Sequence, residues 1–389
     1  MNTLSATIPH GADAAASRWE DLPALLAEIR ARRSEFIASQ QIPRDIVDGF
    51  KRIGVYRAMV ARRFGGDERT PAEFCRLIEA ISEADGSAGW VASFGSAACY
   101  LAALPEATLR KVYANGPDVV FAGGLFPLQP AKRTPDGFVV NGVWKFGSGC
   151  TGADLIGAGI AIAGGESTGG LPRVAVMPVD KVTIRPNWDV LGLRGTGSHD
   201  IVIKDVVVPE EWTLIRGGPA TLDAPIYRYP SLSFAAQVLA IVGIGVARAA
   251  LDDIIVMAGG RTSITGAPVM ADRAYVQLEV AKAEAMLRSA RSFFYEATEA
   301  LWGEVLAGAP TPKTVTLMRL AATNAARSGA EVARIACSLA GTTSIYTQHN
   351  LARTMCDSLV VAQHTFLSEG TLQSAGRILL GLEAQPGFP

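Results

Sequence analysis

Two glycine-rich segments have the residue types and spacing best suited to binding a flat, polar ligand. In residues 144–149 an aromatic strand end runs into a Gly-Ser-Gly turn, where the backbone is open to close approach and Ser148 offers a hydroxyl and an amide. In residues 192–200, glycines alternate with threonine and serine before a predicted strand. Each segment taken alone is more typical of an ordinary turn, so neither identifies a ligand by itself.

The histidines and cysteines show no spacing typical of a metal site or a disulfide framework. No two of the four histidines stand at metal-ligand helical spacing, and the five cysteines are odd in number without a Cys-x-x-Cys pair. We therefore expect no bound metal and a reducing, cytoplasmic location.

Several other functional motifs are incomplete. Gly243-Ile244-Gly245 begins like a dinucleotide fingerprint, but the third position is Arg248 and no strand precedes it. The chain also lacks a Walker loop and a Gly-x-Ser-x-Gly nucleophile elbow. It therefore has no predicted nicotinamide site, and any reductive chemistry would require a separate protein as electron source.

Composition excludes nucleic-acid binding and favours a large folded core. The 389 residues are 49% hydrophobic and 19% charged, with 36 basic and 37 acidic side chains. A net charge near zero supplies no attraction for phosphate backbones. The most apolar stretch, residues 234–247, is shorter than the ~20 residues of a membrane span, so we expect a buried bundle helix and no membrane role.

Hydrophobic periodicity predicts helices, then strands, then helices. Helical spacing runs from residue 20 to about residue 115, with a capping box at Thr70-Pro71-Ala72-Glu73 and a further helix capped by Ser87 and extending to about Leu101. Short β-type runs broken by glycine, proline and Asn-Gly follow, and helical spacing returns after Pro230. The predicted fold class is mainly α with a central β-domain. The predicted divisions are a disordered lead-in (1–16), a helical domain (17–117), a β-domain (118–228) and a helical bundle (229–389).

Four segments in this order resemble the acyl-CoA dehydrogenase superfamily of flavoproteins. They are residues 63–66 (Arg-Phe-Gly-Gly), 84–91 (Ala-Asp-Gly-Ser-Ala-Gly-Trp-Val), 144–149, and 191–200 followed by Val207-Val208-Pro209. The resemblance covers about residues 18–382. It implies an N-terminal helical domain, a middle β-barrel or sandwich, and a C-terminal four-helix bundle. It further implies a flavin between the β-domain and the bundle, in a homotetramer.

The C-terminal segment separates two chemistries within this superfamily. Many dehydrogenases have a Glu-Gly-Thr soon after an Arg…Asp element, and that glutamate removes a substrate proton. Here His364 and Thr365 occupy that place, and Glu369 stands 12 residues after Asp357. The Asp-x6-His arrangement resembles the flavin monooxygenases that act as oxygenase components of two-component hydroxylases. Because a helical turn is about four residues, Glu369 could still face the same side, which keeps the dehydrogenase alternative open.

The monooxygenase resemblance implies roles for particular residues. Ser148 would lie near flavin N5 and accept its proton, and His364, with an ordinary pKa near 6.5, would polarise a donor proton of the substrate. A dry aromatic pocket would protect a flavin C4a-hydroperoxide, which transfers its terminal hydroxyl to an aromatic ring. The implied cofactor contacts are Trp144, Ser148, Gly123, Arg261, His349 and Asp357, and the implied substrate pocket is Trp90, Phe121, His364 and Thr365.

The resulting prediction is an oxygenase component that hydroxylates or epoxidises a small aromatic substrate, with indole or an indole-3-acetate-like compound as the best candidate. It would use O2 and reduced FAD or FMN, with FAD slightly preferred, supplied by a separate NAD(P)H-flavin reductase. Two alternatives remain: α,β-dehydrogenation of acyl-CoA with Glu369 as base, and a non-catalytic binding module with a flavoprotein fold.

Overall fold

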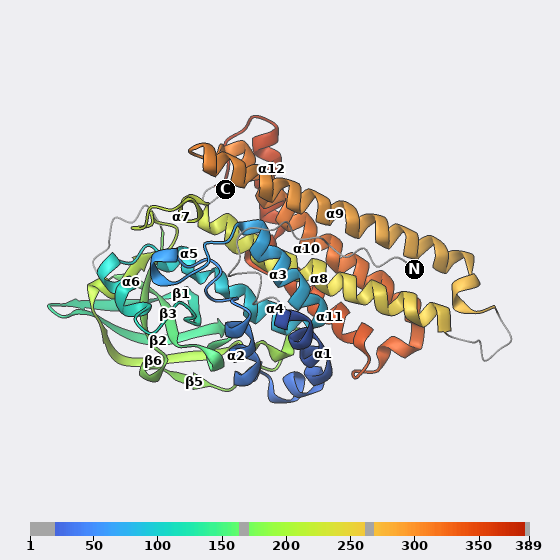
Figure 1. Ribbon diagram of the computed structural model, residues 1–389, viewed down its shortest axis with the longest axis horizontal. Coiled ribbons are helices and arrows are strands. Elements are labelled where there is room, and N and C mark those ends of the chain that lie inside the picture. The colour runs from blue at the N-terminus through green and yellow to red at the C-terminus, as the bar shows by residue number, and fades with distance from the viewer. Residues whose placement is uncertain (1–19, 163–170, 261–267, 386–389) are drawn as a thin grey trace.

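The structure, a computed structural model, describes residues 20–162, 171–260 and 268–385. Helices come first in the chain, strands follow, and long helices complete it (Figure 1). The N-terminal helices are α1 (Leu22–Ser39), α2 (Arg44–Arg52), α3 (Pro71–Ala84), α4 (Gly86–Ser93), α5 (Ala98–Leu101) and α6 (Glu106–Val112). The C-terminal helices are α7 (Pro225–Arg228), α8 (Ser231–Gly260), α9 (Ala274–Ala307), α10 (Pro312–Ala340), α11 (Asn350–Ala362) and α12 (Glu369–Leu379).

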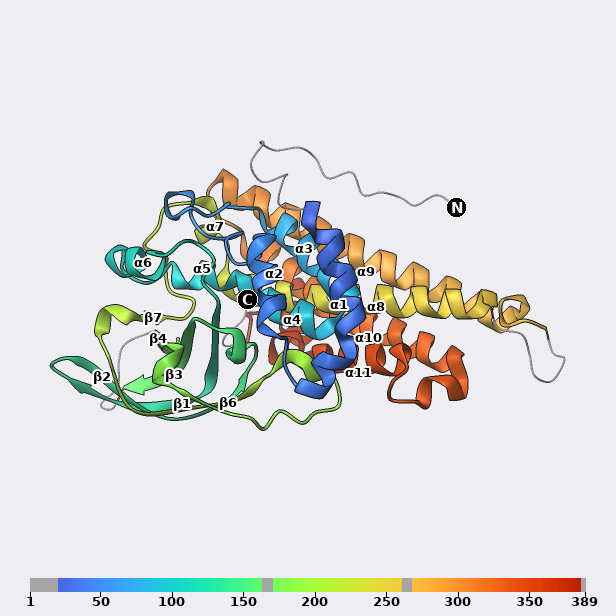
Figure 2. The same ribbon diagram turned by 60° about the horizontal axis from the view of Figure 1, so that its bottom comes forward.

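The described strands form one mixed, seven-stranded sheet with the order β5-β6-β2-β1-β3-β4-β7. Its strands are β1 (Phe121–Thr134), β2 (Gly137–Gly147), β3 (Leu155–Ile162), β4 (Arg173–Pro178), β5 (Thr183–Arg185), β6 (His199–Val208) and β7 (Thr213–Ile215). β1 and β3 pair in parallel and the other neighbours are antiparallel. The sheet has its own hydrophobic core, centred on Phe138, Trp144 and Ile156. In Figure 2 this sheet lies at one end of the long helices.

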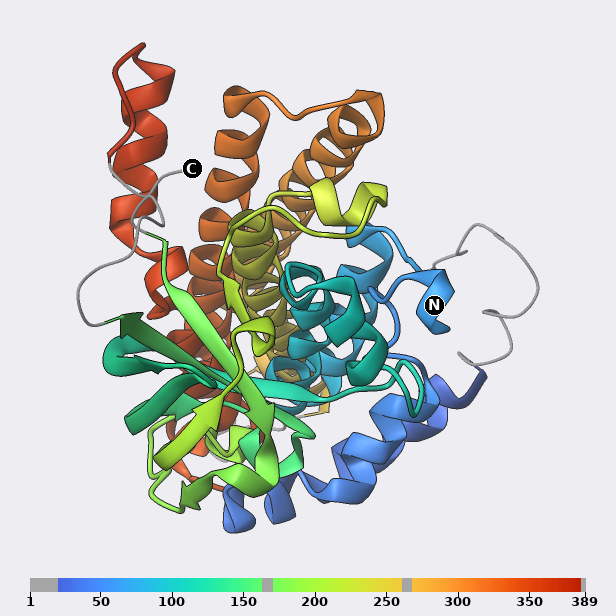
Figure 3. The same cartoon turned by 90° about the vertical axis from the view of Figure 1, so that its left-hand side faces the viewer.

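The long helices α8, α9 and α10 run side by side, and the sheet lies in front of them in Figure 3. α8 is apolar and long enough to cross a membrane by composition, but 89% of its most apolar window is buried inside the protein. It packs against α3, α10 and α11. The expectation of a buried bundle helix at residues 234–247 is therefore confirmed.

Local signals explain where the N-terminal helices begin. The predicted capping box of α3 is present, since Glu73 N donates to Thr70 Oγ1 (3.2 Å) and Thr70 N donates to Glu73 Oε2 (2.8 Å). The prediction for the next helix is wrong at its start, while its end near Leu101 is where α5 ends, after the short helical turn Phe94–Ala97. Asp85, rather than Ser87, caps α4 by accepting from Ala88 N (2.9 Å), and α4 stops at Ser93.

The strand predictions are confirmed in place and differ in length. β1 extends over 14 residues, from Phe121 to Thr134, although glycine and proline interrupt its sequence. β7 has only three residues and pairs with β4 alone, so it has too few alternating side chains for its pattern to stand out.

Candidate active site

Ser148 follows β2 and lies beside Trp90, which comes from α4. Its Oγ accepts a hydrogen bond from Trp90 Nε1 (3.1 Å) and lies 2.7 Å from the Oγ of Ser198, which directly precedes β6. All three side chains are buried. Three of the segments that carried the family resemblance therefore meet at one hydroxyl group.

The hydroxyl groups at this point form a chain with a fixed direction. Thr196 Oγ1 donates to the Leu193 carbonyl (2.9 Å) and lies 2.7 Å from Ser198 Oγ. Because each hydroxyl has one proton, Ser198 donates to Thr196 and Ser148 donates to Ser198. The proton of the Ser148 hydroxyl is therefore already used in the hydrogen bond to Ser198, and one lone pair of Ser148 Oγ remains unused. Toward a ligand it can only accept a hydrogen bond.

A bulge in β2 decides which aromatic side chain faces outward. The register with β6 shifts between Trp144 and Gly147. Trp144, predicted as a cofactor contact, is fully buried in the sheet core and donates from Nε1 to the Gly159 carbonyl (2.9 Å), so its side chain is not exposed to a ligand. Phe146, with φ of 60°, is instead 66% exposed and lies edge-on to Trp188. A bulge re-aims a side chain in this way, and period-2 alternation could not show it.

His364 follows the end of α11 and caps the short helical turn Thr365–Leu367. Its Nδ1 accepts the Phe366 backbone N–H (3.2 Å), so the neutral ring has its proton on Nε2. The ring lies edge-on to Trp90, with 5.9 Å between ring centroids. Burial lowers the pKa of His364 to about 4. At neutral pH His364 is therefore an uncharged hydrogen-bond donor, which changes its predicted role, because the lone pair that would accept a substrate proton is already used.

An NMR titration should place the pKa of the His364 imidazole near 4, with His364→Asn used to assign its signal. Because the lowered pKa favours the neutral ring in the folded protein, this residue's contribution to stability is fully present above about pH 6.5. That contribution is lost as the pH falls through about 4. A midpoint at 6.5 or above would contradict the buried position of the ring.

Asp357 is a buried residue of α11 that holds the loop before β6. Its Oδ1 accepts from Leu193 N (2.6 Å), and its other oxygen lies 3.4 Å from Arg353, which also pairs with Asp85 (2.6 Å). Burial raises the pKa of Asp357 to about 6. Leu193 has a left-handed backbone (φ 53°), and its carbonyl is the end of the hydroxyl chain. Asp357, predicted as a cofactor contact, therefore positions the loop that orients Ser148.

The other predicted residues are distributed around this centre. Phe121 is buried at the start of β1, edge-on to Tyr100 (5.8 Å between centroids). Gly123 lies so close to β3 that an added Cβ would be 2.2 Å from the Gly157 carbonyl oxygen, so strand packing accounts for this glycine. Thr365 is exposed, and His349 caps α11 by accepting from Leu351 N (3.2 Å). Arg261 lies outside the described residues.

Glu369 lies away from the Trp90–Ser148–His364 group. Its side chain is 84% exposed and is 3.4 Å from Arg327. The alternative in which Glu369 faces the same side, one helical turn on, depended on a continuous helix, but α11 ends at Ala362 and a new helix, α12, begins at Glu369. Helical spacing therefore cannot be counted from α11 to Glu369.

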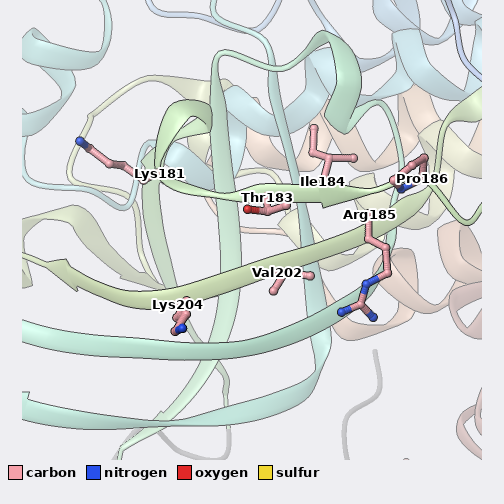
Figure 4. Close-up of a pocket in the computed structure, with 7 residues that line it drawn as sticks. All are labelled: Lys181, Thr183, Ile184, Arg185, Pro186, Val202 and Lys204. Carbon is pink, nitrogen blue, oxygen red and sulfur yellow. The ribbon is translucent and has the colours of Figure 1, made fainter.

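A separate surface groove lies along β5 and β6 and is lined by basic side chains (Figure 4). Its lining residues are Lys181, Thr183, Ile184, Arg185, Pro186, Val202 and Lys204. None of the residues predicted for the active site lines this groove. Among the described residues, no group of three or more metal-ligating side chains occurs.

The surroundings of Ser148 fit a reduced flavin. The hydroxyl offers only an acceptor, and a reduced flavin presents an N5–H donor. Phe146, two residues before Ser148 in the chain, has an exposed ring that contacts Trp188. Leu191, three residues after Trp188, is 64% exposed. Exposed apolar side chains of this size indicate a surface that another molecule covers. Helices, mixed sheet and an acceptor serine at the strand end are the arrangement that the sequence resemblance implied for a flavoprotein of the acyl-CoA dehydrogenase type.

Comparison with known proteins agrees with this class. Residues 237–369 match the family model described as acyl-CoA dehydrogenase, C-terminal domain. An indole-3-acetate monooxygenase of Pseudomonas putida is 56% identical over 360 residues, covering 92% of each chain. Another, from Acinetobacter baumannii, is 50% identical over 378 residues, covering 96% of this chain and 97% of that relative. The crystal structure of 3-HSA hydroxylase from Rhodococcus sp. RHA1 superposes with a TM-score of 0.88 at 24% identity, covering 97% and 99% of the two chains.

The chain belongs to the flavin-dependent monooxygenases that share the acyl-CoA dehydrogenase fold. The predicted fold class, superfamily and type of enzyme are thereby confirmed.

Proposed function

We propose that the protein oxygenates indole-3-acetate, or indole itself, as the oxygenase component of a two-component system. The observation that carries this proposal is that an acceptor hydroxyl, on Ser148, and a neutral N–H donor, on His364, both lie against the side chain of Trp90. The substrate is supported by the two indole-3-acetate monooxygenases, which are 56% and 50% identical to the chain.

When bound, a reduced flavin supplies the two electrons of the reaction, so that one atom of O2 enters the substrate and the other leaves as water. Ser148 Oγ accepts the hydrogen bond of the N5–H group and keeps that proton in place. Trp90 fixes the Ser148 oxygen and, with Phe121, excludes water from the site. His364 Nε2–H donates a hydrogen bond to an oxygen atom at the reacting end of the site.

The remaining predictions extend this proposal. A separate NAD(P)H-flavin reductase provides the reduced flavin, with FAD preferred over FMN, and the protein acts in the cytoplasm as a homotetramer. Exposed apolar side chains support burial of further surface in an assembly, among them Ile345 and Tyr346 beside His349. Sedimentation of the purified protein tests the tetramer, and titration with each reduced flavin tests the preference.

The direct test mixes the enzyme and chemically reduced flavin with ¹⁸O2 and indole-3-acetate, without a reductase. We expect one labelled oxygen atom in the product and one in water. Absence of flavin binding in either oxidation state would instead favour a non-catalytic module. Bleaching of bound flavin by acyl-CoA thioesters without O2 would favour dehydrogenation.

Replacing Glu369 by glutamine should leave oxygenation within about twofold of wild type, because an exposed ion pair contributes at most about 1 kcal/mol. The measurement is the rate of oxygenated product formation at saturating substrate. A loss of activity of tenfold or more, with the fold intact, would restore Glu369 as a catalytic base.

A further inference from the structure

Arg216 is a buried cation that lacks an acidic partner among the described residues. It directly follows β7 and is 7% exposed. Its Nη1 donates to Ser231 Oγ (3.0 Å), and the guanidinium lies 4.2 Å from the centre of the Tyr100 ring. Other partly buried arginines have carboxylate partners, as Arg291 has with Glu79 (2.6 Å) and Arg248 has with Glu284 (2.7 Å). No carboxylate among the described residues pairs with Arg216 in this way.

A buried charge without a counter-ion is costly, so a ligand that brought a negative charge to this guanidinium would bind favourably. Burial also lowers the pKa of Arg216, which shows the same cost. The Nε–H and Nη2–H groups of Arg216 donate to no described residue, which leaves one edge of the planar guanidinium available for a bidentate contact. A carboxylate is the group that fits this edge.

The position of Arg216 connects it to the proposed substrate pocket. The Tyr100 ring contacts both the guanidinium and Phe121, which it meets edge-on with 5.8 Å between ring centroids. Ser231 is the first residue of the 30-residue helix α8, whose amino end has a partial positive charge. Arg216 and the start of α8 therefore both favour binding of an anion near the Tyr100 and Phe121 rings.

We propose that Arg216 binds the carboxylate of an aromatic acid substrate and thereby makes the enzyme prefer indole-3-acetate to uncharged indole. Tyr100 and Ser231 hold the guanidinium in place, and the aromatic ring of the substrate extends past Phe121 toward His364. This inference rests on the proposed function and specifies its substrate class.

The test compares indole-3-acetate with indole in wild type and Arg216→Met, measuring kcat/KM for both and the dissociation constant of each by calorimetry. Loss of a charged hydrogen-bond partner should weaken binding of indole-3-acetate by about 10- to 100-fold. Indole should change by no more than about twofold, because it makes no contact with a carboxylate site. Arg291→Met, which removes a paired arginine, is the matched control and should leave the preference unchanged.

The outcomes separate this inference from the function on which it rests. If wild type oxygenates neither compound, the proposed function fails. If wild type oxygenates indole-3-acetate and folded Arg216→Met keeps the same preference over indole, the role of Arg216 is overturned. If Arg216→Met does not fold, Arg216→Lys decides: a charged but non-planar head should reduce the preference, and an unchanged preference would overturn the proposal.

Discussion

Replacing His364 by alanine should lower the rate of oxygenated product formation by about 100-fold or more, because a positioned hydrogen-bond donor in a water-poor site contributes about that much. The ring lies against Trp90, which itself binds the Ser148 oxygen, so its Nε2–H is close to the proposed site of reaction. Product formation at saturating flavin and substrate is the measurement, with flavin binding measured separately.

Two variants distinguish catalysis from helix capping at this position. His364 accepts the Phe366 N–H, and alanine removes that cap, which costs about 1 kcal/mol of stability. Asparagine can still accept that N–H but is too short to donate where Nε2–H does. His364→Asn should therefore recover stability without recovering activity. If His364→Asn were as active as wild type, the role of His364 would be only structural.

Replacing Ser148 by alanine should shift most of the O2 consumption to hydrogen peroxide, raising peroxide released per NADH by about tenfold. One hydrogen bond of about 1.4 kcal/mol corresponds to such a factor. The variant should also bind reduced flavin more weakly, because the acceptor for N5–H is gone, while its affinity for oxidised flavin stays the same. Oxygen, NADH and peroxide measured together give the coupling ratio.

Ser198→Ala is the informative companion variant, since it leaves Ser148 in place but removes the acceptor of its proton. The Ser148 hydroxyl can then turn and donate, so the preference for reduced over oxidised flavin should fall, with a smaller increase in peroxide. Cys150→Ala, a buried change nearby, is a control that should alter neither quantity. Equal behaviour of Ser198→Ala and wild type would show that the direction of the hydroxyl chain has no effect.

The order of helices and strands could be predicted because it depends on local periodicity, and the family because it depends on short motifs. Which aromatic side chain faces outward could not be predicted, because a bulge between Trp144 and Gly147 leaves Phe146 exposed and Trp144 buried. The place of Glu369 depends on a helix break that hydrophobic spacing does not mark.

Two electrostatic features also depend on tertiary packing alone. The pKa of His364 is lowered by burial, which no residue next to it in sequence indicates. Arg216 stands in a loop without any motif, and only the positions of Tyr100 and Ser231, distant in the chain, make it a buried cation. The properties of His364 and Arg216 can therefore be recognised only from their neighbours in the folded structure.

The hydrogen bond from Leu193 N to Asp357 joins the strand-side loop to a C-terminal helix. Recombination between related enzymes must therefore exchange these two parts together. A chimera that takes residues 118–228 from this chain and its last helices from a protein without a carboxylate at the place of Asp357 would leave a buried amide unsatisfied. The strands would still assemble, yet the Ser148 hydroxyl would lose its fixed orientation.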